Sequence, residues 1–494
     1  MRIHPIDLGI VILYLAGVTL LGAWFRRGQK DVRDYFLGGR TAPAWALACS
    51  IVATETSTLT IIGTPAIAFA GNLGFLQLVM GYLVARVVLC LVLVPRYFQG
   101  EFYTAYQLLE KRFGGRVRSA GAGVFLVTRA LAEGVRIAAV GKVVSLALGT
   151  GSRTAILIVT LLTLFYTFEG GLKAVIWTDV MQLAIYLAGS AAAFLLLLHR
   201  IPGGWSEVSS VAAAAGGKLR VFDFSFSLTR SYTFWSGVLG GTFLSMASHG
   251  TDQTLVQRVL AARNERDGKA ALLGSGVIVF VQFALFLVLG VMLFVFYQHA
   301  APGVVPADAD QIFPAFIVTQ MPPGIAGLVL AAILAVAMSN ASGSLNSLAS
   351  SSMMDFGGGA GASGGGGRSA GDLLKRSRWM TLIWGIVLGS LGLAPWGPVL
   401  VAGLTIASIT YGAMLGVFLL GIWNARANAN GAIAGMLVGI ATMVLVNRFT
   451  ALAWTWYVLV GTVVTFVSGS IVSAIWSGGA GSSGRGLEAK GVSG

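Results

Sequence analysis

Long apolar segments dominate this chain and limit what it can fold into. About 20 consecutive apolar residues are enough to cross the ~30 Å hydrocarbon core of a bilayer. Such segments recur along the whole chain, at 5–25, 42–70, 74–98, 119–148, 153–169, 177–199, 233–250, 270–296, 323–350, 379–394, 397–422, 430–447 and 452–476. Only 11% of the residues are charged, against about 25% in soluble proteins. The sequence therefore predicts an all-α membrane protein with about 13 transmembrane helices.

Basic residues are distributed unevenly between the two sides of the predicted membrane. Most of the 33 Lys and Arg fall in connections on one side, and four lie inside predicted spans, namely Arg86, Arg129, Arg136 and Lys142. Because basic connections stay in the cytoplasm, we expect a plasma (inner) membrane protein with its N-terminus outside and its C-terminus inside. The formal net charge of +14 does not gather on one face or tail, as nucleic-acid binding requires. The expected partner is the lipid bilayer and not nucleic acid.

The connections are too short to add a soluble domain. The longest, at 200–232, 297–322 and 351–378, cannot bury a core of their own. The tail at 477–494 is rich in Gly and Ser, which predicts a disordered cytoplasmic segment. The four His and two Cys form neither a nucleophilic triad pattern nor a metal-ligand cluster. We expect no enzyme activity and no cofactor.

Two polar runs interrupt the apolar segments. Residues 53–60 read ATETSTLT, in the middle of the second predicted span. An unwound stretch there would offer carbonyl and hydroxyl oxygens to a hard cation, whereas the alternative is hydroxyls bonded within an ordinary packed helix. The run at 339–352 reads SNASGSLNSLASSS and serves either close helix packing or cation binding. Its candidate cation ligands are Ser339, Asn340 and Ser342.

The fourth predicted span carries three ionisable residues on one helix face, because Arg129, Glu133 and Arg136 are spaced i, i+4, i+7. An ionisable group at a helix centre costs ~2.5–3.5 kcal/mol, so these should face the interior and pair there. We interpret Arg129 and Glu133 as a structural pair. Arg136 then needs either Glu55 or an anionic substrate. The first option leaves a neutral pocket, and the second favours a carboxylate-bearing or zwitterionic solute.

Several motifs resemble those of the sodium:solute symporter family. FEGGLKAVIWTDVMQ at 168–182 resembles the signature GGL/M-x-A-V-x-W-T-D-x-x-Q, and GTDQTLVQRVLAAR at 250–263 resembles the DQ-x-x-V-Q-R landmark. DYFLGGR at 34–40 and MSNASGSLNSLASSSMMD at 338–355 are also similar to that family. The resemblance extends over about residues 5–425. It implies a secondary active symporter that imports a small organic solute with sodium by alternating access. The alternatives are a symporter of a neutral sugar or vitamin and a transporter-like membrane sensor.

The fold that the resemblance implies is the leucine-transporter architecture. It consists of a leading helix, two inverted five-helix repeats and two C-terminal helices, here at 1–30, 42–199 (spans 2–6), 233–422 (spans 7–11) and 430–476. The first helix of each repeat is broken near the midplane, where the substrate binds. The polar run at 53–60 and the span with Gly240, Gly241 and the SMASHG run occupy corresponding positions. The oligomeric state is left open.

The resemblance also implies positions for sodium. The common sodium site falls on the carbonyls of Ala53, Thr56 and Val336 and on the side chains of Ser339 and Asn340, where the family usually has Ser or Thr in place of Asn340. A possible second sodium falls on Asp179, Ser339 and Ser342. Gly343 replaces a further serine there, and Asp179 has an alternative role as a helix cap. The number of sodium ions, and sodium rather than proton coupling, stay open.

Substrate contacts are implied on four spans. They are Glu55, Ser57 and Thr60 on span 2, Gln77 on span 3, Arg136 on span 4 and the stretch from Phe243 to His249 on span 7. Proline transporters of the family carry an aspartate where Glu55 falls. Arg136 falls close to where sialic-acid transporters of the family use an arginine for the substrate carboxylate.

Overall fold

The computed structural model describes residues 4–25, 40–99, 105–166, 172–299, 305–356 and 370–480, and these form helices without a strand. The helices of the first part are α1 (Pro5–Phe25), α3 (Ala44–Glu55), α4 (Thr58–Ala70), η3 (Leu73–Phe75), α5 (Leu76–Val92), α6 (Val94–Tyr97), α7 (Tyr106–Phe113), α8 (Gly115–Leu148), α9 (Ser152–Tyr166), α10 (Leu172–Arg200) and α11 (Gly204–Ala214). Those of the second part are α12 (Phe234–Thr251), α13 (Gln253–Leu260), α14 (Glu265–His299), η4 (Ala309–Gln311), α15 (Ile312–Gln320), α16 (Ile325–Phe356), α17 (Ala370–Gly392), α18 (Val399–Trp423), α19 (Ala429–Phe449), η5 (Trp454–Trp456) and α20 (Tyr457–Ala480).

The length and composition of these helices agree with a protein that crosses a membrane many times. Within the described residues, seven helices are long and apolar enough to span a bilayer, and two bent pairs, α3 with α4 and α8 with α9, bring the number to nine. Each of the thirteen segments predicted from the sequence contains a helix. The nine candidate spans are fewer than the thirteen predicted segments for three reasons. The apolar parts of α1 and α17 are shorter than a span, α12 is not among the helices that are long and apolar enough, and α9 is counted together with α8.

Both expected helix breaks are present. The first lies between α3 and α4 at Thr56 and Ser57, whose backbones are extended, and the two helices are bent by 66°. This position falls inside the polar run at 53–60. The second lies between α12 and α13 at Asp252, which is also extended and whose side chain accepts a hydrogen bond from Thr254 N. It therefore comes just after the SMASHG run in which the sequence suggested it.

Five helices around the first break pack into one unit. The helices α5 and α12 are in extensive contact, and α14 packs against α3, α4 and α5. Close approach of α5 and α12 depends on glycine, because a Cβ on Gly81 would lie 2.4 Å from Val238 O and one on Gly241 would lie 2.1 Å from Leu78 O. The helices α8 and α18 pack against each other on the other side of the cavity described below.

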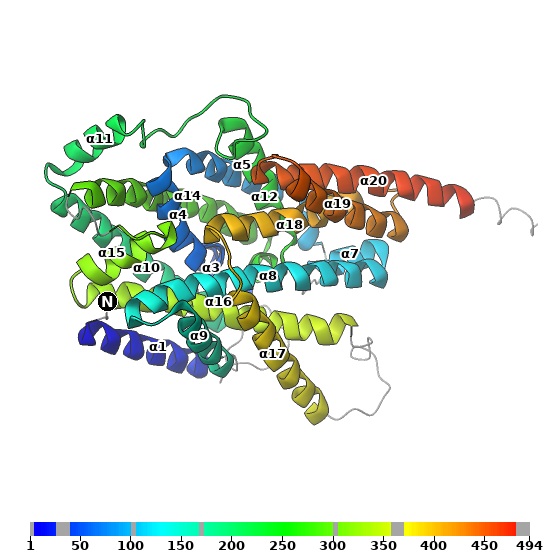
Figure 1. The fold of residues 1–494 in the computed structure, drawn as a ribbon. Helices are drawn as coiled ribbons and strands as arrows, with labels where there is room; N and C mark the ends of the chain where they lie inside the picture. The colour runs from blue at the N-terminus through cyan, green and yellow to red at the C-terminus, as the bar shows by residue number, and fades with distance from the viewer. Residues whose placement is uncertain are drawn as a thin grey trace, which may run out of the picture.

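The order of elements supports two inverted repeats. Spans 2–6 correspond to α3/α4, α5, α8, α9 and α10, and spans 7–11 to α12/α13, α14, α16, α17 and α18. A short helix follows the second span of each series, α7 in the first and α15 in the second, and Figure 1 shows these two at opposite ends of the bundle. Corresponding elements at opposite ends are what an inverted repeat requires. The residue limits 42–199 and 233–422 stay predictions.

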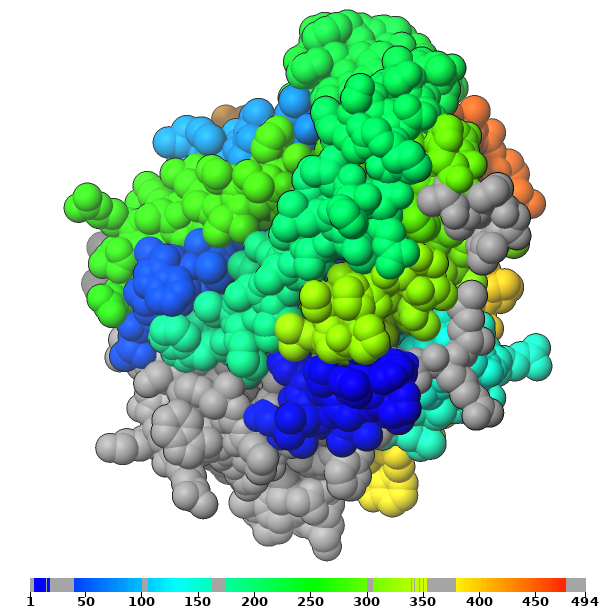
Figure 2. All heavy atoms as spheres, turned by 90° about the vertical axis from the view of Figure 1, so that its left-hand side faces the viewer, coloured from blue at the N-terminus to red at the C-terminus, as the bar shows by residue number. Residues whose placement is uncertain are grey.

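The leading and trailing helices lie outside these series. Figure 2 shows α1, in blue, directly against the first residues of α16, in yellow-green. Asp7 makes this contact specific, because its Oδ1 accepts hydrogen bonds from Gly324 N at 2.6 Å and Gly327 N at 2.8 Å. At the other end of the chain, α19 and α20 pack closely on each other and α20 packs on α18. The predicted disordered tail at 477–494 is wrong for residues 477–480, which belong to α20, and residues 481–494 lie outside the described part.

Candidate functional site: a cavity at the two helix breaks

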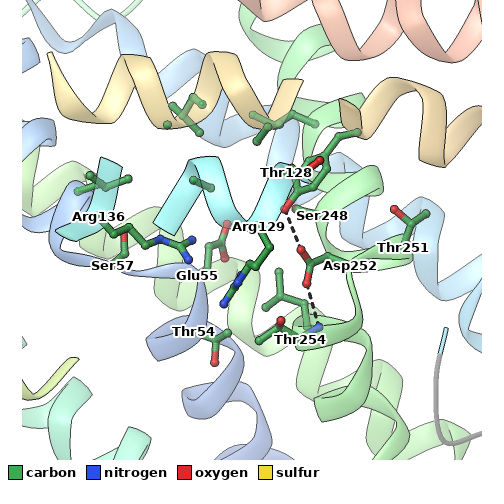
Figure 3. A pocket seen from close by; sticks show the side chains of 18 of the residues that line it. Thr54, Glu55, Ser57, Thr128, Arg129, Arg136, Ser248, Thr251, Asp252 and Thr254 are labelled. Atoms are coloured by element: carbon green, nitrogen blue, oxygen red, sulfur yellow. Dashed lines mark hydrogen bonds between the residues drawn. The ribbon is translucent and has the colours of Figure 1, made fainter. Parts of the chain in front are cut away.

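A cavity of about 150 Å³ lies between the two helix breaks on one side and α8 and α18 on the other. On α18 its lining runs from Leu400 to Met414, which is about 21 Å of helix at 1.5 Å per residue. The polar residues that line it, most of them labelled in Figure 3, are Thr54, Glu55, Ser57, Thr60, Tyr82, Tyr106, Thr128, Arg129, Arg136, Ser248, Thr251, Asp252, Thr254 and Tyr411. An elongated cavity with polar groups at broken helices is the arrangement of a solute path.

The first break frees backbone carbonyls next to the cavity. In an unbroken helix, Ser57 N and Thr60 N would bond the carbonyls of Ala53 and Thr56. Here Ser57 N donates to Thr60 Oγ1 at 3.4 Å, and Thr60 N donates to Ser57 O at 2.9 Å. Both carbonyls, which the family resemblance implies for the common sodium site, therefore lose their usual donors. The Thr56 hydroxyl is engaged elsewhere, with Gln282 on α14.

The other half of that predicted sodium site lies on α16, which packs against α4. Val336 and Asn340 are on this helix, and the Asn340 Nδ2 atom is buried without a hydrogen-bond partner among the described residues. An amide oxygen and nitrogen exchange places by a half rotation of the side chain, so this position also suits an oxygen ligand. Ser339 and Ser342 belong to the same helix, but their side chains lie outside the described part.

Glu55 is neutralised by an arginine from α5. Arg86 Nη2 lies 2.5 Å from Glu55 Oε2 and 3.2 Å from His249 Nε2. Its other nitrogens donate to Ser275 Oγ, Ser245 Oγ and Tyr82 O. The Arg86 side chain is 0% exposed, and all five of its N–H groups have a partner. The sequence-based option of a Glu55–Arg136 pair is therefore wrong.

The ion pair within α8 joins Arg136 to Glu133, with Arg136 Nη1 3.0 Å from Glu133 Oε2. Arg129 reaches Glu133 only indirectly, because its Nε donates to Ser344 Oγ at 2.8 Å and Ser344 in turn contacts Glu133 Oε2 at 2.8 Å. The predicted Arg129–Glu133 pair is therefore wrong. The reason is that Ser344, from α16, enters between the two residues, which spacing along one helix does not reveal.

Arg129 is a cation in the cavity wall that forms no ion pair among the described residues. It is 8% exposed, and within the described residues it makes no ion pair and a single hydrogen bond. Figure 3 shows the guanidinium groups of Arg129 and Arg136 directed toward the region of Glu55. Arg136 also has an unmet donor, since its Nε is buried without a partner in the described part of the chain. A buried guanidinium with free donors is suited to bind an anion.

At the second break, Asp252 supplies a carboxylate to the cavity. Its Oδ2 accepts a hydrogen bond from Tyr411 on α18 at 3.0 Å, and its Oδ1 accepts one from Thr254 N at 2.8 Å. The second contact is a helix N-cap, which explains why α13 begins here. The first contact joins the two walls of the cavity.

Asp179 lies away from the end of its helix, since α10 begins at Leu172, so the alternative role of a helix cap is wrong. Its Oδ2 accepts a hydrogen bond from Ser50 Oγ at 2.6 Å and lies 3.2 Å from Arg258 Nη2. Both partners of this ion pair are buried. A sodium ion at Asp179 would therefore have to displace Arg258, or share the carboxylate with it.

Three predicted substrate residues do not line the cavity. Gln77 Nε2 donates to Gly74 O and Tyr232 O, so it stabilises the connection that precedes α12. Phe243 is half-buried in the hydrophobic core. His249 contacts Glu55 and Arg86 behind the cavity wall. Glu55, Ser57, Thr60 and Arg136 do line it.

Three charged residues at this site have roles that the sequence did not predict. They are Arg86, Arg129 and Asp252. Arg86 was visible as an arginine inside a predicted span, which is costly unless it is paired. Asp252 was visible inside the DQ-x-x-V-Q-R motif. Arg129 was assigned to the wrong partner.

Comparison with known proteins identifies the family. The model of the sodium:solute symporter family matches residues 35–439. A sodium/sialic acid symporter from Proteus mirabilis is 30% identical over 97% of this chain and 97% of its own length. The sodium/iodide cotransporter of Homo sapiens is 31% identical over 88% of this chain and 68% of its own length.

A solved structure shows the same fold. It is described as the substrate-bound outward-open state of a sodium-coupled sialic acid symporter, and it matches with a TM-score of 0.84 and 29% identity over 96% of this chain and 98% of that chain. Together with the broken helices and the cavity between them, these matches show that this chain belongs to the sodium:solute symporter family and is a multi-pass membrane transporter that couples a solute to sodium.

Proposed function

We propose that this protein imports a small carboxylate-bearing solute together with sodium. The main support for this proposal is the environment of Arg129, whose buried guanidinium lines the cavity. Among the described residues it makes one hydrogen bond and no ion pair. A charge inside the membrane is costly without a partner, and a carboxylate offers two oxygens in the geometry of the guanidinium. The solute then supplies the missing counter-charge.

The size and charge of the cavity support a small anion or zwitterion. Its volume of about 150 Å³ lies below the ~300–1,000 Å³ of sites for drug-sized ligands. The carboxylates of Glu55 and Glu133 are already paired, with Arg86 and Arg136, so neither forms an ion pair with Arg129. The route to a neutral pocket through a Glu55–Arg136 pair is absent, which weakens the alternative of a neutral sugar or vitamin. Sialic acid and iodide, which name two relatives, support an anionic solute.

We place the coupling sodium at the first break. The carbonyls of Ala53 and Thr56 lack their usual amide donors there, and Asn340 presents a buried amide atom without a partner in the described residues. Val336 and Ser339 complete the proposed set from α16. Carbonyl, amide and hydroxyl oxygens suit a hard cation.

A second sodium at Asp179, Ser339 and Ser342 is the less favoured arrangement, because Arg258 already neutralises the Asp179 carboxylate. We therefore propose a coupling ratio of one sodium to one solute.

Alternating access would move the two walls of the cavity against each other. One wall is the unit of α3, α4, α5, α12 and α14, and the other is formed by α8 and α18. The Asp252–Tyr411 hydrogen bond crosses between them, so opening on that side requires it to break. The distribution of basic residues favours an N-terminus outside and a C-terminus in the cytoplasm of the plasma membrane.

Uptake by proteoliposomes tests this function. We expect an inward sodium gradient to drive accumulation of at least one labelled carboxylate among sialic acid, lactate, propionate and alanine, and potassium in place of sodium to abolish it. A carboxylate that binds with sodium but is never accumulated would instead favour a transporter-like sensor. Accumulation of a neutral sugar with no response to carboxylates would contradict the proposal.

A further inference from the structure

Arg86 is the most completely bonded charged side chain near the cavity, yet it does not line the cavity itself. Its five N–H groups reach four elements: Glu55 at the first break, Tyr82 O on its own helix α5, Ser245 and His249 on α12, and Ser275 on α14. Gly276 makes room for it, since a Cβ there would lie 2.7 Å from Arg86 Cδ. The guanidinium is therefore fixed in place by the whole unit that forms one wall.

This fixed guanidinium determines which part of Glu55 faces the solute. Arg86 holds Oε2, and His249 Nε2 lies 3.4 Å from the same oxygen. Oε1 makes no hydrogen bond within the described residues, and Glu55 lines the cavity with 14% of its side chain exposed. One carboxylate oxygen is thus occupied by the protein, and the other remains an acceptor on the cavity side.

The His249 ring supports this arrangement. Its Nδ1 lies 2.9 Å from Ser248 Oγ and 3.3 Å from Ser245 O. Since only a protonated nitrogen can donate to a carbonyl, these contacts fit an Nδ1–H tautomer, which leaves Nε2 to accept from Arg86. The ring is then neutral and adds no charge beside Glu55.

The free Glu55 oxygen faces the same cavity as the guanidinium groups of Arg129 and Arg136 (Figure 3). A solute whose carboxylate binds the arginines of α8 leaves this oxygen to meet whatever group lies next to the carboxylate. A polar group of the solute that could donate a hydrogen bond would satisfy it, whereas an apolar group would leave a buried acceptor without a partner, which is unfavourable.

We propose that Arg86 is a positioning residue that presents Glu55 Oε1 to the solute, so that the protein selects carboxylates with an adjacent O–H or N–H donor over simple carboxylates. This inference rests on the proposed function, because it needs the carboxylate to bind on α8. The inference narrows the solute class to hydroxy acids or amino acids. Arg86 does not contact the solute in this arrangement, and its role is to hold Glu55 so that Oε1 can accept a hydrogen bond from the solute.

Three probes with the same carbon skeleton test the selection. Propionate, lactate and alanine differ only in carrying hydrogen, hydroxyl or ammonium next to the carboxylate. Dissociation constants are measured with the full-length protein in sodium. We expect lactate, alanine or both to bind about 10- to 100-fold more tightly than propionate, the range of one hydrogen bond to a charged acceptor. The stronger of the two identifies the donor as hydroxyl or ammonium.

The variant Arg86→Lys tests the positioning role. Lysine keeps the charge that neutralises Glu55, but its ammonium cannot reproduce the planar fork that bonds four elements. We expect the preference over propionate to fall to about threefold or less, with the affinity for propionate itself unchanged. If Arg86 had only a structural role, Arg86→Lys would lower the stability of the protein or all three affinities. The ratio between the affinities for the three probes would then stay the same. If Arg86→Lys does not fold, the preference for lactate or alanine over propionate is measured in Glu55→Gln instead. This variant removes the charge of the acceptor.

Arg112→Lys is the matched control, because Arg112 donates to the carbonyls of Gly421, Asn424 and Ala425 away from the cavity. It should retain the full preference. Equal binding of propionate, lactate and alanine by the parent protein would overturn this inference and leave the proposed function intact. If none of the three, nor sialic acid, binds to protein that still binds sodium, the proposed function fails and this inference with it.

Discussion

Two buried arginines, Arg86 and Arg129, stand near the same cavity and are bonded in opposite ways. Arg86 is 0% exposed and uses all five donors, one of them in an ion pair with Glu55. Arg129 is 8% exposed and uses one donor, to the neutral hydroxyl of Ser344. A completed guanidinium holds the structure, whereas an incomplete one in a cavity wall is available to a ligand. The number of unmet donors therefore separates the two roles better than burial does.

The largest effect is expected from removing the completed arginine. Arg86→Ala leaves the Glu55 carboxylate without its partner, which costs about 3–5 kcal/mol of folding stability. The measurement is thermal unfolding of the purified protein. Combining Arg86→Met with Glu55→Gln removes both charges and should recover much of the loss. If Arg86→Ala were as stable as the parent protein, the Arg86–Glu55 pair would not be structural. The proposed difference in role between Arg86 and Arg129 would then be wrong.

The incomplete arginine should behave in the reverse way. Arg129→Ala removes a charge that forms no ion pair among the described residues, so we expect thermal stability to be unchanged or higher. The affinity for the transported carboxylate should fall about 100-fold, because charge-assisted hydrogen bonds are lost. Sodium binding in the absence of solute serves as the control and should be retained. Strong destabilisation with normal solute affinity would assign Arg129 to the structure instead.

Arg136 is intermediate, since it has one ion pair and one unmet donor. Arg136→Ala should lower solute affinity about tenfold, less than Arg129→Ala, and should also lower stability because Glu133 loses its partner. Parallel titrations of the two variants with the same carboxylate give the order. A larger loss of affinity in Arg136→Ala than in Arg129→Ala would exchange the roles that we assign to them.

The smallest effect concerns Asn340, where the same criterion of an unmet polar atom points to sodium. Asn340→Ala should raise the sodium concentration for half-maximal uptake about tenfold, the equivalent of ~1.4 kcal/mol. Asn340→Ser restores an oxygen and should recover most of the difference. Uptake is measured at saturating solute, so that a change in solute affinity does not contribute. If both variants had the same sodium dependence as the parent protein, Asn340 would not be a sodium ligand.

The sequence predicted the helical membrane fold and, through the family resemblance, a solute site at the broken helices. Apolar segments located the helices, and the polar run at 53–60 predicted the break at Thr56 and Ser57, because hydroxyls and an acid are out of place in a continuous span. The second break was predicted less sharply. It follows the SMASHG run at Asp252, whose side chain caps the next helix.

The pairing of charges could not be predicted from the sequence. Helical spacing shows that Arg129, Glu133 and Arg136 share a face, but the rotation of neighbouring helices decides their partners. Ser344 separates Arg129 from Glu133, and Arg86 reaches Glu55 from α5. Such contacts join residues far apart along the chain, and the periodicity of one helix carries no information about them.

We assign the carboxylate of the solute to Arg129. The most direct test compares the affinity of the best-transported carboxylate with that of its methyl ester, in the parent protein and in Arg129→Ala, at saturating sodium. The ester has nearly the same shape and lacks the charge. We predict that Arg129→Ala lowers the preference for the acid about 100-fold relative to the parent protein, and that Arg136 retains a smaller preference. An undiminished preference for the acid in Arg129→Ala would contradict this assignment.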